Sequence, residues 1–304
     1  TILLVIIMSI DGVFLHHLTK ELHTSLQFAR IQKIYQVRQT DFVFSLSNKK
    51  VLYFALGDAY PNVRISKLDF TKDFAPSSFV MLLRKYLERG VITDIKQYQN
   101  DRVLMFHIQQ KDELGYQHMR ILIVELITRY TNFIITDENY TILDVFKKTS
   151  IDAKRILLPK MGYPFLVSEQ ESPFLLQPNS RYQGVGKLLQ QEIQAYGLQD
   201  VISRNTTPTK FVQENTTLFY AFDLKTIQAE RITYPTLSDM LEEYFLEKSN
   251  QQAEDTYKKG ILSFLVSQRK KAIKKLDKQT EELQNADTFL SYEKYGNLLS
   301  SNLH

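Results

Sequence analysis

The sequence predicts an α+β protein. We expect an N-terminal antiparallel β-sandwich with two helices, then a small α-helical domain and the start of a long coiled-coil helix. Three observations predict this class. Short runs of β-branched and aromatic residues alternate with turn-forming residues in the first half of the chain. Two amphipathic segments interrupt these runs. A heptad repeat occupies the C-terminal part of the 304 residues.

The first predicted helix spans residues 12–27. Asp11 precedes it and is suited to cap its N-terminus, because a short carboxylate can accept a hydrogen bond from a free backbone N–H. Apolar residues recur every four positions in one stripe, so we expect this helix to lie on a sheet. The stripe consists of Phe14, Leu18, Leu22 and Leu26. A second helix is predicted between Pro76 and Gly90, since proline suits the first helical turn and glycine the residue after the last.

Eight short runs are predicted as strands, because they are rich in Val, Ile, Phe and Tyr and are bounded by polar breaks. Short hairpins join most of them, which implies antiparallel pairing. Two helices and about eight strands make one α+β sandwich. The predicted strands are 31–37, 41–47, 51–56, 91–98, 103–108, 119–126, 133–136 and 142–146.

A middle domain is predicted after a proline-containing linker at 168–180. Gly184-Val185-Gly186 opens a helix there, and free N–H groups at such a turn can bind a phosphate. A plain turn between helices is the alternative, because glycine commonly serves turns. Residues 211–213 and 218–224 form a small hairpin, and a further helix starts at Thr236.

The last segment is predicted to be one long helix from about Ala253 to Leu290, with an apolar seam interrupted by Arg269. Such a seam needs a partner helix, so we expect a truncated coiled-coil arm whose return helix lies beyond the chain. The seam residues are Leu262, Val266, Ile273, Leu276, Thr280, Leu283 and Leu290. The same helix carries six basic residues that could contact phosphate or rRNA, a solvated face being the alternative. They are Arg269, Lys270, Lys271, Lys274, Lys275 and Lys278.

We expect four parts in the chain: an extension at 1–7, the sandwich at 8–168, the middle domain with its hairpin at 169–250, and the arm at 251–304. The apolar extension is too short to cross a bilayer, which needs about 20 residues. It also lacks the basic start and cleavage site of a secretory signal. We therefore expect no membrane contact.

Composition excludes several kinds of chemistry. The chain has no cysteine, which removes disulfides, thiolate zinc sites, iron–sulfur clusters and a cysteine nucleophile. The histidines lack acidic partners at ligand spacing, and no phosphate-binding P-loop, Gly-x-Ser-x-Gly elbow or His-Glu-x-x-His motif is present. We therefore expect no cofactor, no metal and no enzymatic activity. The net charge of +4 permits a polyanionic partner.

Five blocks of the sequence, taken in order, resemble the successive motifs of the NFACT family. The blocks are Met8-Ser9-Ile10-Asp11-Gly12, residues 81–88, Asn100-Asp101-Arg102, residues 111–115 and residues 125–132. This family includes bacterial RqcH-type ribosome quality-control factors, which are also filed as fibronectin- or fibrinogen-binding proteins. The resemblance runs from Met8 to about the C-terminus, and its beginning there implies the boundary between the extension and the sandwich.

The resemblance implies a sandwich related in fold to the N-terminal half of formamidopyrimidine-DNA glycosylases, followed by a helix-hairpin-helix-like module. Glycosylase activity itself is not expected, because the N-terminal proline and the cysteine zinc finger are missing. The implied function is that of a cytoplasmic adaptor. It would bind the large ribosomal subunit and its rRNA when a nascent chain is obstructed, and present tRNA, typically alanine tRNA, for C-terminal tailing.

Carried over by motif, Asp101 and Arg102 are the expected tRNA-binding residues, with Asp11 supporting them. Glu125 and Arg129 are expected to buttress the same turn. Two other readings stay open. One is a surface adhesin that binds fibronectin or fibrinogen, with a secondary location at the cell surface. The other is a scaffold that uses its coiled coil to dock a protein.

Overall fold

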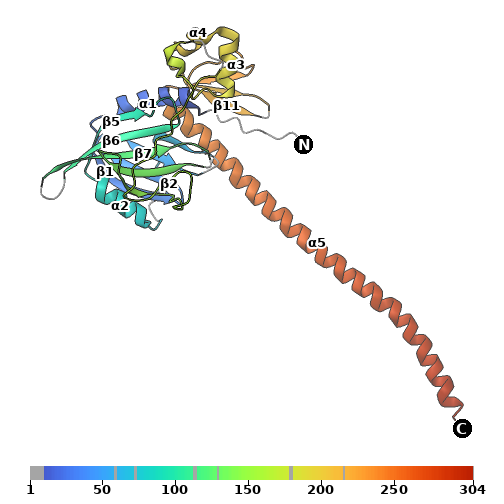
Figure 1. Ribbon diagram of the computed structural model, residues 1–304. Helices are drawn as coiled ribbons and strands as arrows, with labels where there is room; N and C mark the ends of the chain where they lie inside the picture. Colours follow the sequence, from blue (N-terminus) through green and yellow to red (C-terminus); the bar gives the residue numbers. More distant parts are fainter. Residues whose placement is uncertain are drawn as a thin grey trace. The chain divides into compact units, whose positions relative to one another are not determined.

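The structure is a computed structural model that describes residues 10–57, 60–71, 74–111, 115–128, 130–177, 181–214 and 216–303 (Figure 1). The chain to Phe245 forms one compact unit, and the chain from Leu246 forms a second. The predicted divisions at 168/169 and 250/251 stay predictions. The proposed extension at 1–7 lies outside the described residues.

Two antiparallel sheets form the first half of the chain, as predicted. The four-stranded sheet has the order β1-β2-β3-β4, and the five-stranded sheet has the order β5-β6-β7-β8-β9. The strands are β1 (Ile31–Arg38), β2 (Asp41–Leu46), β3 (Val51–Ala55), β4 (Asn62–Ser66), β5 (Val91–Gln97), β6 (Val103–Lys111), β7 (Gln117–Glu125), β8 (Asn132–Asp137) and β9 (Ile142–Val145). Strand β4 was not predicted. Its central residue is Arg64, which is buried over the Tyr53 ring, so the strand lacks an apolar signature.

Aromatic side chains from both sheets meet in the core between them. The ring of Phe54 on β3 lies 5.7 Å from that of Phe106 on β6 and 4.8 Å from that of Phe133 on β8. Both pairs have the edge-to-face geometry that aromatic quadrupoles favour. All three side chains are buried. The two sheets therefore pack face to face around a single apolar layer, which confirms the predicted sandwich.

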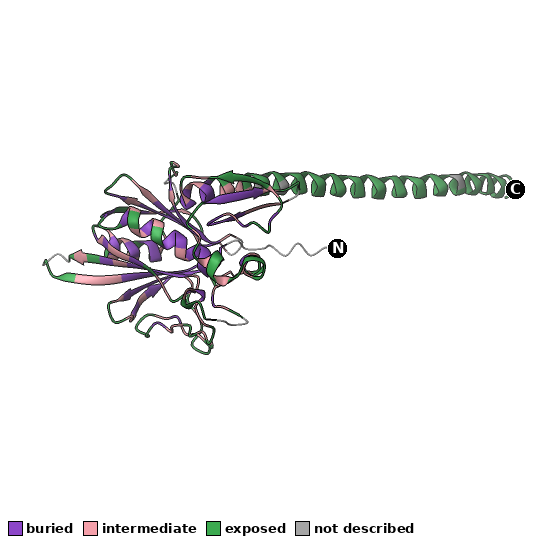
Figure 2. Ribbon diagram, turned by 90° about the horizontal axis from the view of Figure 1, so that it is seen from above, coloured by how far each residue is buried: buried purple, intermediate pink, exposed green. Residues whose placement is uncertain are grey.

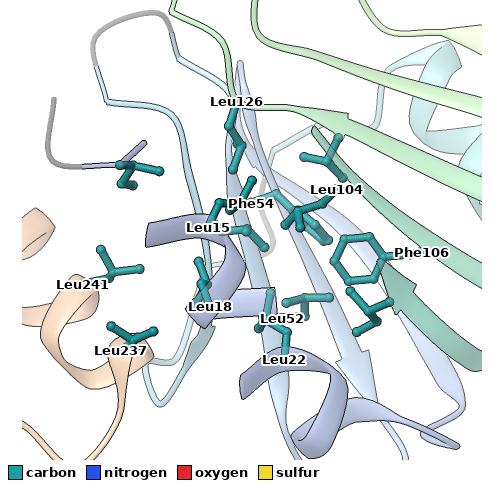
Figure 3. Close-up of a cluster of buried hydrophobic side chains, with 14 of the residues drawn as sticks. Leu15, Leu18, Leu22, Leu52, Phe54, Leu104, Phe106, Leu126, Leu237 and Leu241 are labelled. Carbon is teal, nitrogen blue, oxygen red and sulfur yellow. The ribbon is translucent and has the colours of Figure 1, made fainter. Parts of the chain in front are cut away.

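Helices α1 (Gly12–Leu26) and α2 (Ser78–Leu87) cover the sandwich. Helix α1 packs against β5, and α2 packs against β1. The leucines of α1 lie between the sheet residues and the start of α5 (Figure 3). The middle domain also covers the first turns of α1, since Phe14 meets Phe219 at 5.5 Å and His17 Nδ1 is hydrogen-bonded to Thr206 Oγ1 at 2.7 Å. The predicted stripe is completely buried, but α1 is enclosed on two sides rather than one.

The two helices and the strands after them repeat one pattern. Each helix ends in an extended residue, and the next residue, Phe28 or Arg89, has a positive φ. The backbone bonds between the copies are reciprocal: Phe28 N donates to Ile92 O at 2.8 Å, and Arg89 N donates to Ile31 O at 2.8 Å. Buried residues recur at identical spacing in both copies. They are Leu22, Leu26, Ile31 and Ile34 in the first, and Leu83, Leu87, Ile92 and Ile95 in the second. A local pseudo-twofold axis passes between Arg30 and Val91, which form an isolated bridge.

The middle domain contains helices and a small sheet. Helix α3 ends at Gly197, as predicted, and Gly197 has a φ of +86°. The expected hairpin forms, but a third strand joins it in the order β11-β10-β12. All four residues of β12 are exposed, so the strand has no hydrophobic alternation to predict it. The elements are η1 (Pro173–Leu175), α3 (Lys187–Tyr196), α4 (Leu198–Ile202), β10 (Thr209–Val212), β11 (Thr217–Tyr220) and β12 (Glu230–Thr233).

Helix α5 (Leu237–Ser301) begins in the first unit. Thr236 Oγ1 accepts from Asp239 N, as the capping pattern predicted, and the Glu21 carboxylate of α1 accepts from the N–H of Leu237. From residue 251 onward all described side chains are exposed, including the seam (Figure 2). One continuous helix is confirmed. In the described part of the chain, no helix combines the length and apolar character that crossing a membrane requires.

Replacing Leu18 by alanine tests the two-sided burial of α1. Leu18 is fully buried, so we expect Leu18→Ala to lower the free energy of unfolding by about 2–5 kcal/mol. Met81→Ala on α2 is the matched control, because Met81 is 54% exposed. This substitution should lower the free energy of unfolding by no more than about 0.5 kcal/mol. Urea denaturation measures both. A Leu18→Ala loss below about 1 kcal/mol would contradict the tight enclosure of α1.

Candidate nucleic-acid interface

The Asn100-Asp101-Arg102 motif forms the turn between β5 and β6, as predicted. Tyr98 N donates to Val103 O at 2.9 Å, and Asp101 N donates back to Tyr98 O at 3.1 Å. Asp101 and Arg102 are both half-buried. Asp101 Oδ1 accepts from the backbone N of Arg102 at 2.7 Å, so this carboxylate braces its own turn.

Side-chain and backbone bonds fix this turn to its neighbours. Gln97 Nε2 donates to Asp101 O and to Gly12 O, both at 2.8 Å, and so joins the turn to the start of α1. Leu126 N, at the end of β7, donates to Arg102 O at 2.8 Å. The backbone that carries Asp101 and Arg102 is therefore held by two separate elements.

Asn100 connects the turn to both α1 and the middle domain. It is 1% exposed, and its Nδ2 donates to Gln183 O. A Cβ atom at Gly12 would lie 1.9 Å from Asn100 O, and one at Gly184 would lie 2.0 Å from the same oxygen. Gly184 also has a φ of +70°, which side chains disfavour. Three backbone segments therefore meet at a distance that only glycine permits.

Asp11 joins two helix N-termini behind this turn. Its Oδ1 accepts from Phe14 N at 2.8 Å, as the predicted N-cap, and its Oδ2 accepts from Gly186 N at 2.9 Å. The Tyr220 hydroxyl donates to both oxygens, at 2.9 and 3.1 Å. Burial raises the pKa of Asp11 to about 6, although these bonds and the nearby charge of Arg102 favour the carboxylate.

This arrangement changes the interpretation of three predicted site residues: Gly184, Gly186 and Asp11. The N–H of Gly186 is not free for a phosphate, contrary to our expectation, because it already donates to Asp11. Gly184 serves the close approach to Asn100 instead. Asp11 is 8% exposed and both of its oxygens are occupied, so it positions helices and does not present an open acceptor. Its support of the tRNA turn stays a prediction.

Glu125 lies at the end of β7 and is completely buried. Its carboxylate pairs with both terminal nitrogens of Arg155, one at 3.0 Å, and accepts from the Tyr163 hydroxyl at 2.6 Å. Glu125 stands opposite Val103, next to the turn, as a buttress should. Its partner is Arg155 from the segment after β9. Arg129, the partner that we expected, lies outside the described residues, as do Met8 and Ser9.

The six basic residues predicted to contact phosphate or rRNA lie on α5 in the second unit. All are exposed, and Lys278 is 3.7 Å from Glu282 in an i,i+4 ion pair. Such a pair on a solvated helix contributes little stability. The ranges that the structure describes hold no group of three or more histidines and carboxylates arranged for a metal.

Sequence reasoning missed the residues that hold the site together. Gln97 and Asn100 belong to the hairpin, but their partners are on α1 and before α3. Tyr220 and Arg155 act on carboxylates that are distant in sequence. No local spacing in the sequence predicts these contacts, because each one joins helices, strands or loops that are brought together only by the packed fold.

Comparison with known proteins gives consistent matches. The family described as NFACT N-terminal and middle domains matches residues 11–196 and 189–304. The chain is 30% identical to "Rqc2 homolog RqcH" of Bacillus subtilis (strain 168), over 98% of this chain and 59% of that protein. It is 29% identical to "Ribosome quality control complex subunit NEMF" of Homo sapiens, over 51% of this chain and 14% of NEMF. The chain thus spans about 59% of the length of the bacterial relative.

Two solved structures resemble the chain. The N-terminal part of the fibronectin/fibrinogen-binding protein from Streptococcus suis has a TM-score of 0.67 and 29% identity, over 79% of this chain and 100% of that one. The fibrinogen binding protein from Staphylococcus aureus has a TM-score of 0.68 and 23% identity, over 78% of this chain and 99% of that one. This second similarity shows only that the two chains share a fold.

A glycine substitution tests the three-segment contact. Gly184→Ala places a methyl group against Asn100 O at a positive φ, so we expect a loss of about 2 kcal/mol or more in the free energy of unfolding. Gly162→Ala is the control, since nothing lies within 4 Å of its Cβ position. Thermal or urea unfolding compares the two. Equal stability of both variants would rule out close packing at this contact.

The buried carboxylate should give a pH-dependent stability. The pKa of Asp11 is raised from 3.8 to about 6, because burial favours the neutral carboxyl in the folded state. Its contribution to the free energy of unfolding is therefore fully present below pH 4 and is lost as pH rises through 6. We therefore expect the stability of the wild type, relative to Asp11→Asn, to fall by about 2 kcal/mol between pH 4.5 and pH 7.5. Urea unfolding at both pH values measures this difference. A difference that grows with pH would mean that the hydrogen bonds keep the carboxylate charged.

Proposed function

The chain belongs to the NFACT family, and we propose on this basis that it acts in ribosome-associated quality control as a tRNA-binding adaptor. Its relatives in bacteria and humans carry names that refer to this process. The proposed partners are the large ribosomal subunit with its rRNA, and tRNA. We further propose that the tRNA is alanine tRNA, that the site of action is the cytoplasm, and that the chain itself catalyses no reaction.

The observation that carries this proposal is the braced turn at Asp101 and Arg102. An arginine on a fixed turn can make two parallel hydrogen bonds to a phosphate or a base edge, and loses little freedom when it binds. Both side chains are half-buried and so remain partly open to solvent. Asp101 can accept from an exposed base amino group through the oxygen that does not brace the turn.

The supporting residues act through this turn. Gln97 and Asn100 hold its backbone against α1 and the middle domain, and Asp11 fixes the helix ends at that contact. Glu125 and its ion pair with Arg155 support the neighbouring strand end. We infer that these residues set the position of Arg102 and do not themselves touch tRNA.

In this proposal the adaptor supplies binding and placement, while the ribosome forms the peptide bonds. The six basic residues of α5 would contact rRNA phosphates, because lysine and arginine gain affinity by releasing the counterions of a polyanion. These residues belong to the second unit, whereas the turn belongs to the first, so the two contact surfaces can be altered independently.

A second candidate function is binding of fibronectin or fibrinogen. The likeness to a Streptococcus suis protein named for this activity favours it. Salt dependence separates the two functions. RNA binding should weaken steeply as salt rises, by about one ion for each phosphate contacted, whereas an apolar protein interface should change little.

Substitution of Arg102 tests the proposed tRNA turn. Arg102→Ala removes a charge-assisted contact worth about 1.5–3 kcal/mol, so tRNA affinity should fall by about 10- to 150-fold. Stability should fall by no more than about 1 kcal/mol, because the side chain is half-buried but the bonds that hold the turn come from the Arg102 backbone. If Asp101 and Arg102 act together, the double alanine variant should lose less than the sum of the single losses.

The measurements are tRNA copurification and alanine tailing on stalled large subunits, each with a melting curve. Normal tailing by the double variant would refute the assignment. Lost tailing together with a collapsed melting temperature would instead assign a purely structural role to the turn.

A further inference from the structure

A second exposed surface lies at the C-terminal end of α1. This helix has 15 residues and is therefore about 22 Å long, so its C-terminal end is distant from the Asp101–Arg102 turn. Here the two copies of the repeated pattern meet. Phe28 follows α1, Arg89 follows α2, and the bridge between Arg30 and Val91 joins them. We call this surface the helix-end corner; it consists of Phe28, Arg30, Lys49 and Arg89.

Lys49 joins the corner through the turn between β2 and β3. Arg30 N donates to Ser47 Oγ, and Ser47 N donates to Arg30 O, both at 2.9 Å. Two further bonds attach this turn to the end of α1, where Asn48 Nδ2 and Lys50 Nζ both donate to Ser25 O at 3.2 Å. Three chain segments are thus fixed side by side at the corner.

Three corner residues have backbone conformations that glycine would adopt more easily. Phe28, Lys49 and Arg89 have φ values of 65°, 62° and 68°. A side chain at positive φ is strained, and strain of this kind concentrates where a side chain has a function. Phe28 is also 72% exposed, so its ring gains little from burial. Neither folding nor packing explains a phenylalanine at this position.

Within the described ranges, the cations of the corner have no paired carboxylate. Arg30, Lys49 and Arg89 are exposed, and none has a side-chain hydrogen bond or ion pair to any residue in the described ranges. The neighbouring acids are occupied. Glu88 accepts from Ile34 N at 2.9 Å and lies 3.9 Å from Arg84, and Asp94 pairs with Lys96 at 2.7 Å. The corner therefore combines an exposed aromatic residue with three exposed cations on neighbouring segments, none of which is paired within the described ranges.

We propose that the helix-end corner is a second RNA-binding surface, which takes a single-stranded segment. Arg30, Lys49 and Arg89 would contact successive phosphates, and an unpaired base would stack on the Phe28 ring. This combination is the usual chemistry for single-stranded nucleic acid, since cations follow the backbone and an aromatic ring accepts any base. An acidic peptide would use the cations but gives no reason for the strained, exposed ring.

Glycine substitutions test this proposal without strain. Phe28→Gly and Arg89→Gly remove the side chains and leave a residue that favours the observed φ, so both variants should fold. Lys160→Gly is the matched control, because Lys160 is an exposed lysine with a φ of 71° outside the corner. Phe28→Asn serves as a second variant, since asparagine also tolerates positive φ.

The probe is a fluorescein-labelled 12-nucleotide oligouridine, with an RNA duplex of the same length as the comparison. Phe28→Gly should weaken oligouridine binding about 5- to 150-fold and change duplex binding little, because duplex bases are not free to stack. Arg89→Gly should weaken binding of both probes and lower the salt dependence by about one ion. Lys160→Gly should bind like the wild type.

Two results would overturn the proposal. One is wild-type oligouridine affinity in Phe28→Gly, Phe28→Asn and Arg89→Gly. The other is an equal loss in Lys160→Gly, which would reduce the effect to net charge. Arg102→Ala, measured on tRNA in the same experiment, keeps the two sites distinct. If only Arg102→Ala weakens RNA binding, the corner proposal is refuted and the tRNA turn is supported. If only the corner variants weaken RNA binding, the corner is supported and the turn assignment is refuted.

Discussion

The buried carboxylate of Asp11 is the interaction on which the rest of the site depends. It accepts from the first turn of α1, from the N–H that precedes α3, and from the Tyr220 hydroxyl of the small sheet. A buried charge is tolerated only when its lone pairs are satisfied, and here three parts of the chain supply the donors. Asp11 therefore links the sandwich to two parts of the middle domain, next to the contact that Asn100 makes with Gln183.

Much of the fold was predictable, because the sandwich is built from strongly patterned segments. The apolar stripe of α1, its Asp11 cap and the hairpin strands follow from local periodicity. Two strands lacked that periodicity. Residue Arg64 fills the centre of β4, where it is buried through contacts with Tyr53 and Glu242, and β12 is exposed throughout. The repeated spacing that begins at Leu22 and Leu83 is visible in the sequence, and could have predicted the pseudo-twofold arrangement.

The site was predictable only in part. A turn at Asn100 and a cap at Asp11 are local features, and the sequence indicated both. The hydrogen-bond partner of the Gly186 N–H could not be predicted, because the acceptor, Asp11, lies 175 positions earlier in the chain. The same holds for Glu125, whose arginine partner comes from a segment without regular structure. Local rules predict which groups need a partner, whereas the packed fold decides which partner they obtain.

The pseudo-twofold repeat also bears on how this protein can change over time. Its two helices occupy equivalent places on the sandwich, but α1 buries nine residues and α2 buries four. When an element is present twice, one copy can gain additional packing contacts while the other continues to pack only on the sandwich. The outward face of α2, which includes Met81, is free to accept substitutions. In α1, nine of the fifteen residues are buried, and they contact both the sandwich and the middle domain, so we expect substitutions to accumulate faster in α2.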